Sequence, residues 1–139
     1  MELKRPEKLK NKSEPAPELD RLAKEIIGAA LEVHKVLGPG FLESVYEDAL
    51  CVELKMRGLP FIRQPAVMVE YKGHDVGEGR LDLVVGGKVI VELKAVEALA
   101  PIHTAQLLSY LKMTNRQLGL LINFNAEMLR DGIKRVINS

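Results

Sequence analysis

Two kinds of apolar pattern divide the chain. In its first part, apolar positions recur every three or four residues over 19–37 and again over about 41–57, and glycine and proline follow each stretch. Apolar residues at this spacing share one face of an α-helix, and glycine and proline end helices. The pattern therefore predicts two consecutive helices.

After about residue 60 the pattern changes to short β-type runs separated by glycines. The order of the predicted elements indicates an α/β (α+β) fold, with a mixed β-sheet that contains an antiparallel meander and is flanked by helices. The predicted elements are strands over 61–63, 66–71, 80–85 and 88–96, a helix over 102–113, a strand over 118–124 and a helix over 126–137.

The length of the chain and its charged N-terminal segment predict one domain preceded by a mobile segment. The chain of 139 residues is long enough to bury one core. Residues 1–18 are rich in Lys, Glu and Pro and contain almost no large apolar groups, so burial cannot offset the entropy of ordering them. We therefore predict a mobile charged arm over 1–18 and a single domain over 19–139.

Charge and cysteine content indicate the cellular location and the binding partners to expect. No apolar run approaches the roughly 18 residues of a membrane span, and the charged start does not match a secretory signal. Cys51 is the single cysteine, which excludes an intrachain disulfide, so we expect a cytoplasmic protein with no membrane partner. The formal net charge of +1 provides no global attraction to nucleic acid, so any phosphate binding must be local.

Two charges interrupt the apolar run 89–96. If this run is a strand, Glu92 and Lys94 share one of its faces. Asp82 interrupts the preceding apolar run in the same way. A two-residue turn at the intervening Gly-Gly pair would put Asp82 and Glu92 on opposite faces, whereas a turn that includes Lys88, or a bulge, pairs them. We expect the longer or bulged turn.

Paired carboxylates of this kind suit metal chemistry. Two carboxylates about 5 Å apart in a partly buried place repel each other, and a divalent cation relieves the repulsion. All-oxygen ligands favour Mg²⁺ or Mn²⁺. Lys94, on the same face, can orient or deprotonate the attacking water, so Asp82, Glu92 and Lys94 suit metal-assisted phosphodiester hydrolysis. The alternative is an edge hairpin whose solvated face carries Glu92 and Lys94 as a weak surface pair.

Further motifs strengthen the first interpretation. "GPGFLESVYEDAL" contains Gly40-x-x-Glu43-x-x-Tyr46, "QLLSY" contains Gln106-x-x-x-Tyr110, and the chain ends in "LINFNAEMLRDGIKRVIN". With Asp82 and Glu92-Leu93-Lys94, these motifs resemble the GxxExxY family, a branch of the PD-(D/E)xK nuclease superfamily, from about Leu22 to Asn138. The resemblance implies a restriction-endonuclease-like core with its site at the central hairpin.

The resemblance also implies roles. Asp82 and Glu92 match the metal-binding acids, Lys94 the catalytic lysine, Glu43 the acid of the leading helix, and Gln106 and Tyr110 an additional motif on the later helix. Leu81 stands where the superfamily name has Pro, a residue that ligates nothing. The implied protein is a Mg²⁺- or Mn²⁺-dependent nuclease that acts on nucleic acid, with DNA expected ahead of RNA. A homodimer would help the cleavage of two strands, although the sequence carries no interface signal.

Helical geometry leaves alternatives for several of these residues. A helical wheel places Glu43 in an apolar stripe, so it either meets a partner at the site or flanks or caps the helix. Gln106 and Tyr110 share a face and either contact phosphate or position ligands, or are a buried amide and phenol bonded to backbone. His34 either complements the helix dipole or lies near the site, and Arg80 either steers phosphate or is solvated.

Two functional hypotheses follow. The first is the metal-dependent nuclease, and the second is a non-catalytic nucleic-acid or protein interaction module on a nuclease-like scaffold. The complete set of Asp82, Glu92 and Lys94 favours the enzyme, because a binding module has no need of carboxylates that face phosphate. An aromatic content of 4% without Trp gives little support to a platform that stacks single-stranded bases.

Overall fold

A computed structural model describes residues 15–139, so residues 1–14 of the predicted arm lie outside the described part. The first helix already begins at Pro17, two residues before the predicted domain. In chain order the elements are α2 (Pro17–Leu37), α3 (Glu43–Met56), β1 (Phe61–Arg63), β2 (Ala66–Tyr71), β3 (His74–Arg80), β4 (Leu83–Val85), β5 (Val89–Lys94), α4 (Pro101–Met113), β6 (Leu118–Asn123), the 3₁₀ turn η2 (Leu129–Gly132) and β7 (Ile133–Ile137).

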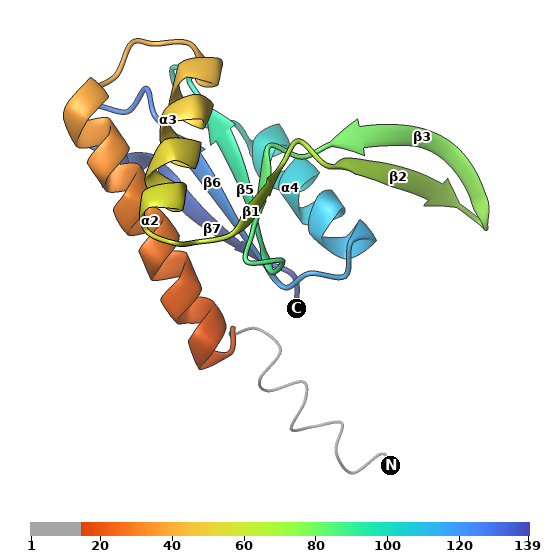
Figure 1. The fold of residues 1–139 in the computed structure, drawn as a ribbon. Helices are drawn as coiled ribbons and strands as arrows, with labels where there is room; N and C mark the ends of the chain where they lie inside the picture. Colours follow the sequence, from red (N-terminus) through yellow and green to blue (C-terminus); the bar gives the residue numbers. More distant parts are fainter. Residues whose placement is uncertain (1–14) are drawn as a thin grey trace.

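The main sheet has five strands in the order β1-β4-β5-β6-β7 (Figure 1). β5 and β6 run parallel and the other neighbours are antiparallel, so the predicted mixed sheet is confirmed. β2 and β3 form a separate antiparallel hairpin, here called the arm hairpin, which projects away from the body of the domain (Figure 1).

Helices cover both faces of the main sheet. Residues of α2 and α3 pack with Val91 and Leu93 of β5 in the larger core cluster. The smaller cluster joins Leu107 of α4 to Ile90 on the opposite face of the same strand. Because strand side chains alternate, Glu92 belongs to the same side of β5 as Ile90. The flanking helices and the mixed sheet confirm the predicted restriction-endonuclease-like fold class.

The arm hairpin corrects one part of the sequence prediction. We predicted that the glycines at 77 and 79 would separate strands, but β3 runs through both of them. A Cβ atom at Gly79 would lie 2.6 Å from the Tyr110 hydroxyl oxygen, so glycine lets the Tyr110 ring pack directly on the strand. Gly79 therefore marks a close contact with α4 rather than the end of a strand.

The C-terminal segment is a second correction. The predicted helix over 126–137 is wrong, because the chain forms η2 and then β7, an edge strand antiparallel to β6. β6 is buried along its whole length, and its free edge needs backbone partners that a helix would not provide. At the turn between them, a Cβ atom on Gly132 would lie 2.6 Å from the Asn123 carbonyl oxygen, so this close approach requires glycine.

Candidate active site

The β4–β5 hairpin sets two acids opposite each other. Its register pairs Leu83 with Val91 and Val85 with Val89, so the connection contains three residues, 86–88. Continued by one position, the same register places Asp82 opposite Glu92. The predicted longer turn is therefore confirmed, and its two glycines adopt the left-handed conformation, with φ of +62° and +70°.

Asp82 lies in a break between strands. The predicted continuous strand over 80–85 is interrupted, because β3 ends at Arg80 and β4 begins at Leu83. The break is held by β1 and the residues that follow it: the Gln64 N–H donates to the Asp82 carbonyl oxygen over 2.8 Å, and the Leu81 N–H donates to the Pro65 carbonyl oxygen over 3.0 Å. Asp82 is thus freed from the sheet ladder but fixed in place.

The two acids each accept a hydrogen bond from a backbone N–H across the hairpin. The Asp82 N–H donates to Glu92 Oε2 over 3.0 Å, and the Leu93 N–H donates to Asp82 Oδ2 over 2.7 Å. These bonds fix both carboxylates across the hairpin from each other, with Glu92 buried and Asp82 partly buried.

Burial and mutual repulsion disfavour the charged forms of both acids. Glu92 is only 7% exposed. Burial, followed by the negative charge of Asp82, raises the pKa of Glu92 to about 8. Burial also raises the pKa of Asp82, which the Leu93 N–H partly opposes. Both shifts favour the protonated forms of this pair, so the hairpin does not present the solvated face of the alternative interpretation.

Lys94 ends β5 on a well-braced segment. It is partly buried and aligned with Asn123 of the parallel strand β6, and the Phe124 N–H donates to its carbonyl oxygen over 2.8 Å. The buried Asn123 side chain accepts from the Val96 N–H over 3.0 Å and donates to the Val96 carbonyl oxygen over 2.9 Å. Asn123 was not among the predicted site residues, and the available signal was an amide at the end of an apolar strand.

A second residue that sequence reasoning missed is the carboxylate Glu47. It is buried, accepts from Arg63 Nε over 2.9 Å, and accepts from Gln64 Nε2 over 3.1 and 3.2 Å. Gln64 has a φ of +54°, a conformation that costs free energy in residues other than glycine. Since the Gln64 N–H also binds the Asp82 carbonyl oxygen, Glu47 is linked to Asp82 through one residue.

Glu43 occupies a different place from the one its helical wheel predicted. It is the first residue of α3 and is exposed, so its position in a buried apolar stripe is wrong. Glu43 does share the helix face of buried Leu50, but it stands at the exposed start of the helix, and the buried acid on that face is Glu47 one turn later. The charges of Glu47 and Glu43 nevertheless raise the pKa of Asp82, while Lys94 lowers it.

A comparison with protein families now decides the relationship. A family model described as the PD-(D/E)XK nuclease superfamily matches residues 20–136. The chain belongs to the PD-(D/E)XK nuclease superfamily. Membership implies a nuclease-like function toward nucleic acid, which superfamily members generally carry out with divalent metals. Searches of curated proteins and of solved structures gave no match. The GxxExxY branch stays a prediction.

In this member of the superfamily, Tyr46 has a structural position. It is fully buried, its hydroxyl donates to the Gly38 carbonyl oxygen over 2.6 Å, and it accepts from the Phe41 N–H over 3.1 Å. Its ring stacks on Phe124 with 4.6 Å between ring centroids. Tyr46 thus fixes the connection from α2 to α3 and with it the start of the helix that carries Glu43 and Glu47.

The two residues predicted on the later helix lie in different surroundings. Gln106 is exposed, which does not fit a buried amide. Tyr110 is partly buried and packs on Gly79 of the arm hairpin, two residues from Leu81 along the chain. α4 therefore braces the strand that leads into Asp82, and the catalytic roles of Gln106 and Tyr110 stay predictions.

His34 and Arg80 both make backbone contacts. His34 Nε2 donates to the Ala126 carbonyl oxygen over 2.8 Å, which ties α2 to the segment after β6. Arg80 donates to the Gln64 carbonyl oxygen over 2.8 Å and lies 3.5 Å from Glu78. Arg80 therefore supports the segment beside Asp82 from the solvent side.

The donor set fits a hard divalent cation. Within residues 15–139, no group of three His, Cys, Asp or Glu side chains is arranged to hold a metal ion. Mg²⁺ and Mn²⁺ need fewer protein ligands, because one or two carboxylates commonly hold them while water and substrate phosphate complete the shell. Asp82 and Glu92 supply two such oxygen donors, and burial, with the charges of neighbouring acids, raises both pKa values, so a cation would favour the ionised pair.

The helices of the described part carry no membrane signal. None of those in residues 15–139 is both long and apolar enough to cross a bilayer.

Proposed function

We propose that the protein is a metal-dependent nuclease that hydrolyses phosphodiester bonds of nucleic acid, DNA ahead of RNA. The observation that carries the proposal is the buried pair of Asp82 and Glu92, hydrogen-bonded across a hairpin, with Lys94 two residues further along the same strand. Perturbed acids beside a lysine are the groups that hydrolysis of a phosphodiester requires.

Asp82 and Glu92 would hold the ion, Mg²⁺ or Mn²⁺. When bound, such an ion supplies Lewis-acid stabilisation of the phosphate oxygens and lowers the pKa of a water molecule. Glu43 is a further candidate ligand, because its charge already acts on Asp82. Loss of a proton from the Asp82–Glu92 pair accompanies metal binding, since a ligating carboxylate is ionised.

Lys94 acts on the water and the phosphate. It orients or deprotonates the water whose oxygen forms the new bond to phosphorus, while the ester P–O bond breaks and the leaving oxygen takes up a proton. Its positive charge also offsets the charge that develops on the phosphate. Gln106 and Tyr110 contact the substrate from α4, the helix that packs against the strand leading into Asp82.

We place the protein in the cytoplasm. Its single cysteine, Cys51, is free and cannot form an intrachain disulfide, which fits a reducing compartment.

The test is cleavage of labelled single-stranded, duplex and branched DNA and of RNA, each with Mg²⁺, with Mn²⁺ and with a chelator. Lys94→Ala and Asp82→Asn are compared with Glu78→Gln, a matched control on the exposed arm hairpin. Metal-dependent cleavage that both site variants lose and the control retains supports the proposal and identifies the substrate. No cleavage above the two site variants on any substrate leads instead to the non-catalytic interaction module.

A further inference from the structure

The outer face of α3 carries an apolar stripe whose large side chains are exposed and whose one small residue, Ala49, is partly buried. The stripe consists of residues spaced by three, four, three and four positions, and it lies opposite the helix face that packs on the sheet. Its central large residue, Val52, is 58% exposed. The members of this outer stripe are Leu42, Val45, Ala49, Val52 and Met56.

A groove beside the stripe extends the apolar surface onto α2. α2 and α3 form the outermost layer on their side of the sheet (Figure 1). Between them lies a pocket of about 320 Å³, lined mainly by apolar side chains of both helices, among them Val36, Ala49 and Val52. Contiguous exposed apolar surface with polar edges is typical of interaction sites, whereas single exposed apolar residues are ordinary.

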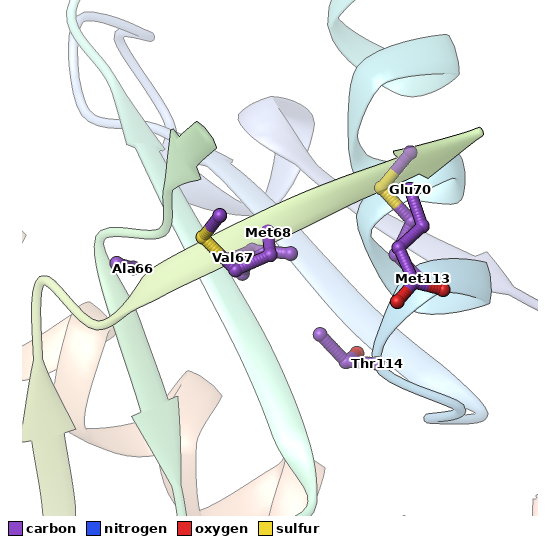
Figure 2. Close-up of a pocket in the computed structure, with 6 residues that line it drawn as sticks. All are labelled: Ala66, Val67, Met68, Glu70, Met113 and Thr114. Atoms are coloured by element: carbon purple, nitrogen blue, oxygen red, sulfur yellow. The ribbon is translucent and has the colours of Figure 1, made fainter. Parts of the chain in front are cut away.

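A larger pocket elsewhere lacks this continuity. It measures about 490 Å³ and lies between the arm hairpin and the end of α4 (Figure 2). Met68 and Met113 contribute apolar surface, but Glu70 and Thr114 line it as well, and no repeating apolar pattern passes through it. The outer stripe of α3 is therefore the better-defined surface.

The spacing of the stripe is complementary to itself. Apolar residues that recur at alternating steps of three and four form a line along one helix face, and two helices can pack side by side along this line. In an antiparallel pair, Val45 of one copy lies opposite Met56 of the other, and Ala49 lies opposite Val52. Each of these facing pairs occurs twice in the dimer, as a two-fold axis requires. The small side chain of Ala49 leaves space beside the groove for Val52 of the second copy.

The charges that flank the stripe select the same orientation. Asp48 and Lys55 lie on one edge of it, both exposed, although Asp48 also contacts Arg63 within its own chain. Antiparallel pairing brings Asp48 of each copy beside Lys55 of the other, which gives two symmetric attractive pairs. Parallel pairing would bring Asp48 beside Glu53 of the other copy, and two acids repel.

We propose that the protein forms a two-fold symmetric homodimer in which the outer stripes of two α3 helices pack antiparallel, with α2 at the edge. This proposal does not depend on nuclease activity, since none of the outer stripe belongs to the candidate site.

The first test is sedimentation equilibrium of the full chain at micromolar concentrations. The wild type is expected at twice the mass of one chain, and Val52→Glu is expected to raise the dimer dissociation constant by about 100-fold or more, because it buries two like charges. The control is Ile102→Glu, since Ile102 is 68% exposed but lies on α4. A monomeric wild type, or a dimer that survives Val52→Glu with an unchanged circular dichroism spectrum, overturns the proposal.

A second test addresses the orientation. Lys55→Asp and Asp48→Lys should each weaken self-association, and an equimolar mixture of the two variants should restore a dimer containing one chain of each. Only antiparallel pairing places both acids of one variant against both lysines of the other. A mixture that associates no better than either variant alone contradicts the arrangement, and circular dichroism shows whether each variant is folded.

Discussion

Two strands of this protein carry the same charge spacing with different consequences. β3 contains Glu78-Gly79-Arg80 and β5 contains Glu92-Leu93-Lys94, each with an acid two residues before a base. On the arm hairpin the side chains are 50% and 56% exposed and form one long ion pair of 3.5 Å. In the main sheet, Glu92 is buried beside a second acid and its pKa is raised.

The difference shows that spacing alone does not make a site. The exposed pair of β3 is screened by water and contributes little free energy. In a buried pair of acids, ionisation of both carboxyl groups costs free energy, because the two negative charges repel each other away from water. A bound cation offsets this cost, so metal binding favours the ionised pair. The second acid, Asp82, comes from another part of the chain, so the distinction depends on the hairpin register.

The largest expected effect is on catalysis. Lys94→Ala should lower the rate of metal-dependent cleavage by about 10²- to 10⁴-fold, the usual contribution of a positioned acid–base group. Glu78→Gln should leave the rate within about twofold, because an exposed pair makes little difference. Initial cleavage rates on the preferred substrate measure the effect of both variants. Equal losses of rate in the two variants would contradict the functional difference between β3 and β5.

The next largest effect is on the free energy of unfolding, which should depend on pH when a chelator keeps the protein free of metal. Because the folded pKa of Glu92 is raised from 4.5 to about 8, the native state keeps a proton that the unfolded state loses. The contribution of Glu92 to stability is therefore fully present below about pH 4.5 and is lost as the pH rises through about 8. The loss should amount to a few kcal/mol in urea unfolding. Glu92→Gln should flatten the curve in this window and Glu78→Gln should not.

Metal binding should oppose that loss. Saturating Mg²⁺ or Mn²⁺ should raise the free energy of unfolding by about 1 to 3 kcal/mol, since a ligand at 100 times its Kd contributes about 2.7 kcal/mol. The gain should be greater at pH 8 than at pH 6, because the cation competes with protons for the carboxylates of Asp82 and Glu92. Thermal unfolding of Asp82→Asn should show no such gain, and an equal gain there would point to binding elsewhere.

A smaller effect is expected from Glu47. Glu47→Gln weakens the contacts that hold Gln64 and, through it, the Asp82 backbone, so cleavage should slow by about tenfold, or about 1.4 kcal/mol of barrier. The matched variant is Glu53→Gln on the same helix, which loses only its pair with Arg57. If Glu47→Gln changes stability but leaves the cleavage rate and its pH profile as in the wild type, Glu47 is structural only.

The smallest effect is on the arm hairpin itself. Glu78→Gln should change the free energy of unfolding by less than about 0.5 kcal/mol, the usual value for an exposed pair. A larger change in urea unfolding would mean that Arg80 depends on Glu78 to support the Gln64 carbonyl oxygen.

Local patterns were enough to predict most of the elements. α2, α3 and α4 were predicted because their apolar positions repeat along a single helix. The pairing of Asp82 with Glu92 was expected from one of two possible turns at the Gly-Gly pair, and the register confirms it. β7 could not be predicted, since Ile133, Val136 and Ile137 also fit a helical spacing. Pairing with the distant β6 decided between the two structures.

The sequence by itself determined the alternation that puts Glu92 and Lys94 on one side of β5, and the glycines that allow the turn to Asp82. Both depend on backbone geometry over a few residues. Only the tertiary structure decided that Glu47 rather than Glu43 is the buried acid of α3, that Gly79 accommodates Tyr110, and that Glu92 has a raised pKa while Glu78 stays solvated. Burial depends on which distant elements cover a side chain, and no local pattern specifies that.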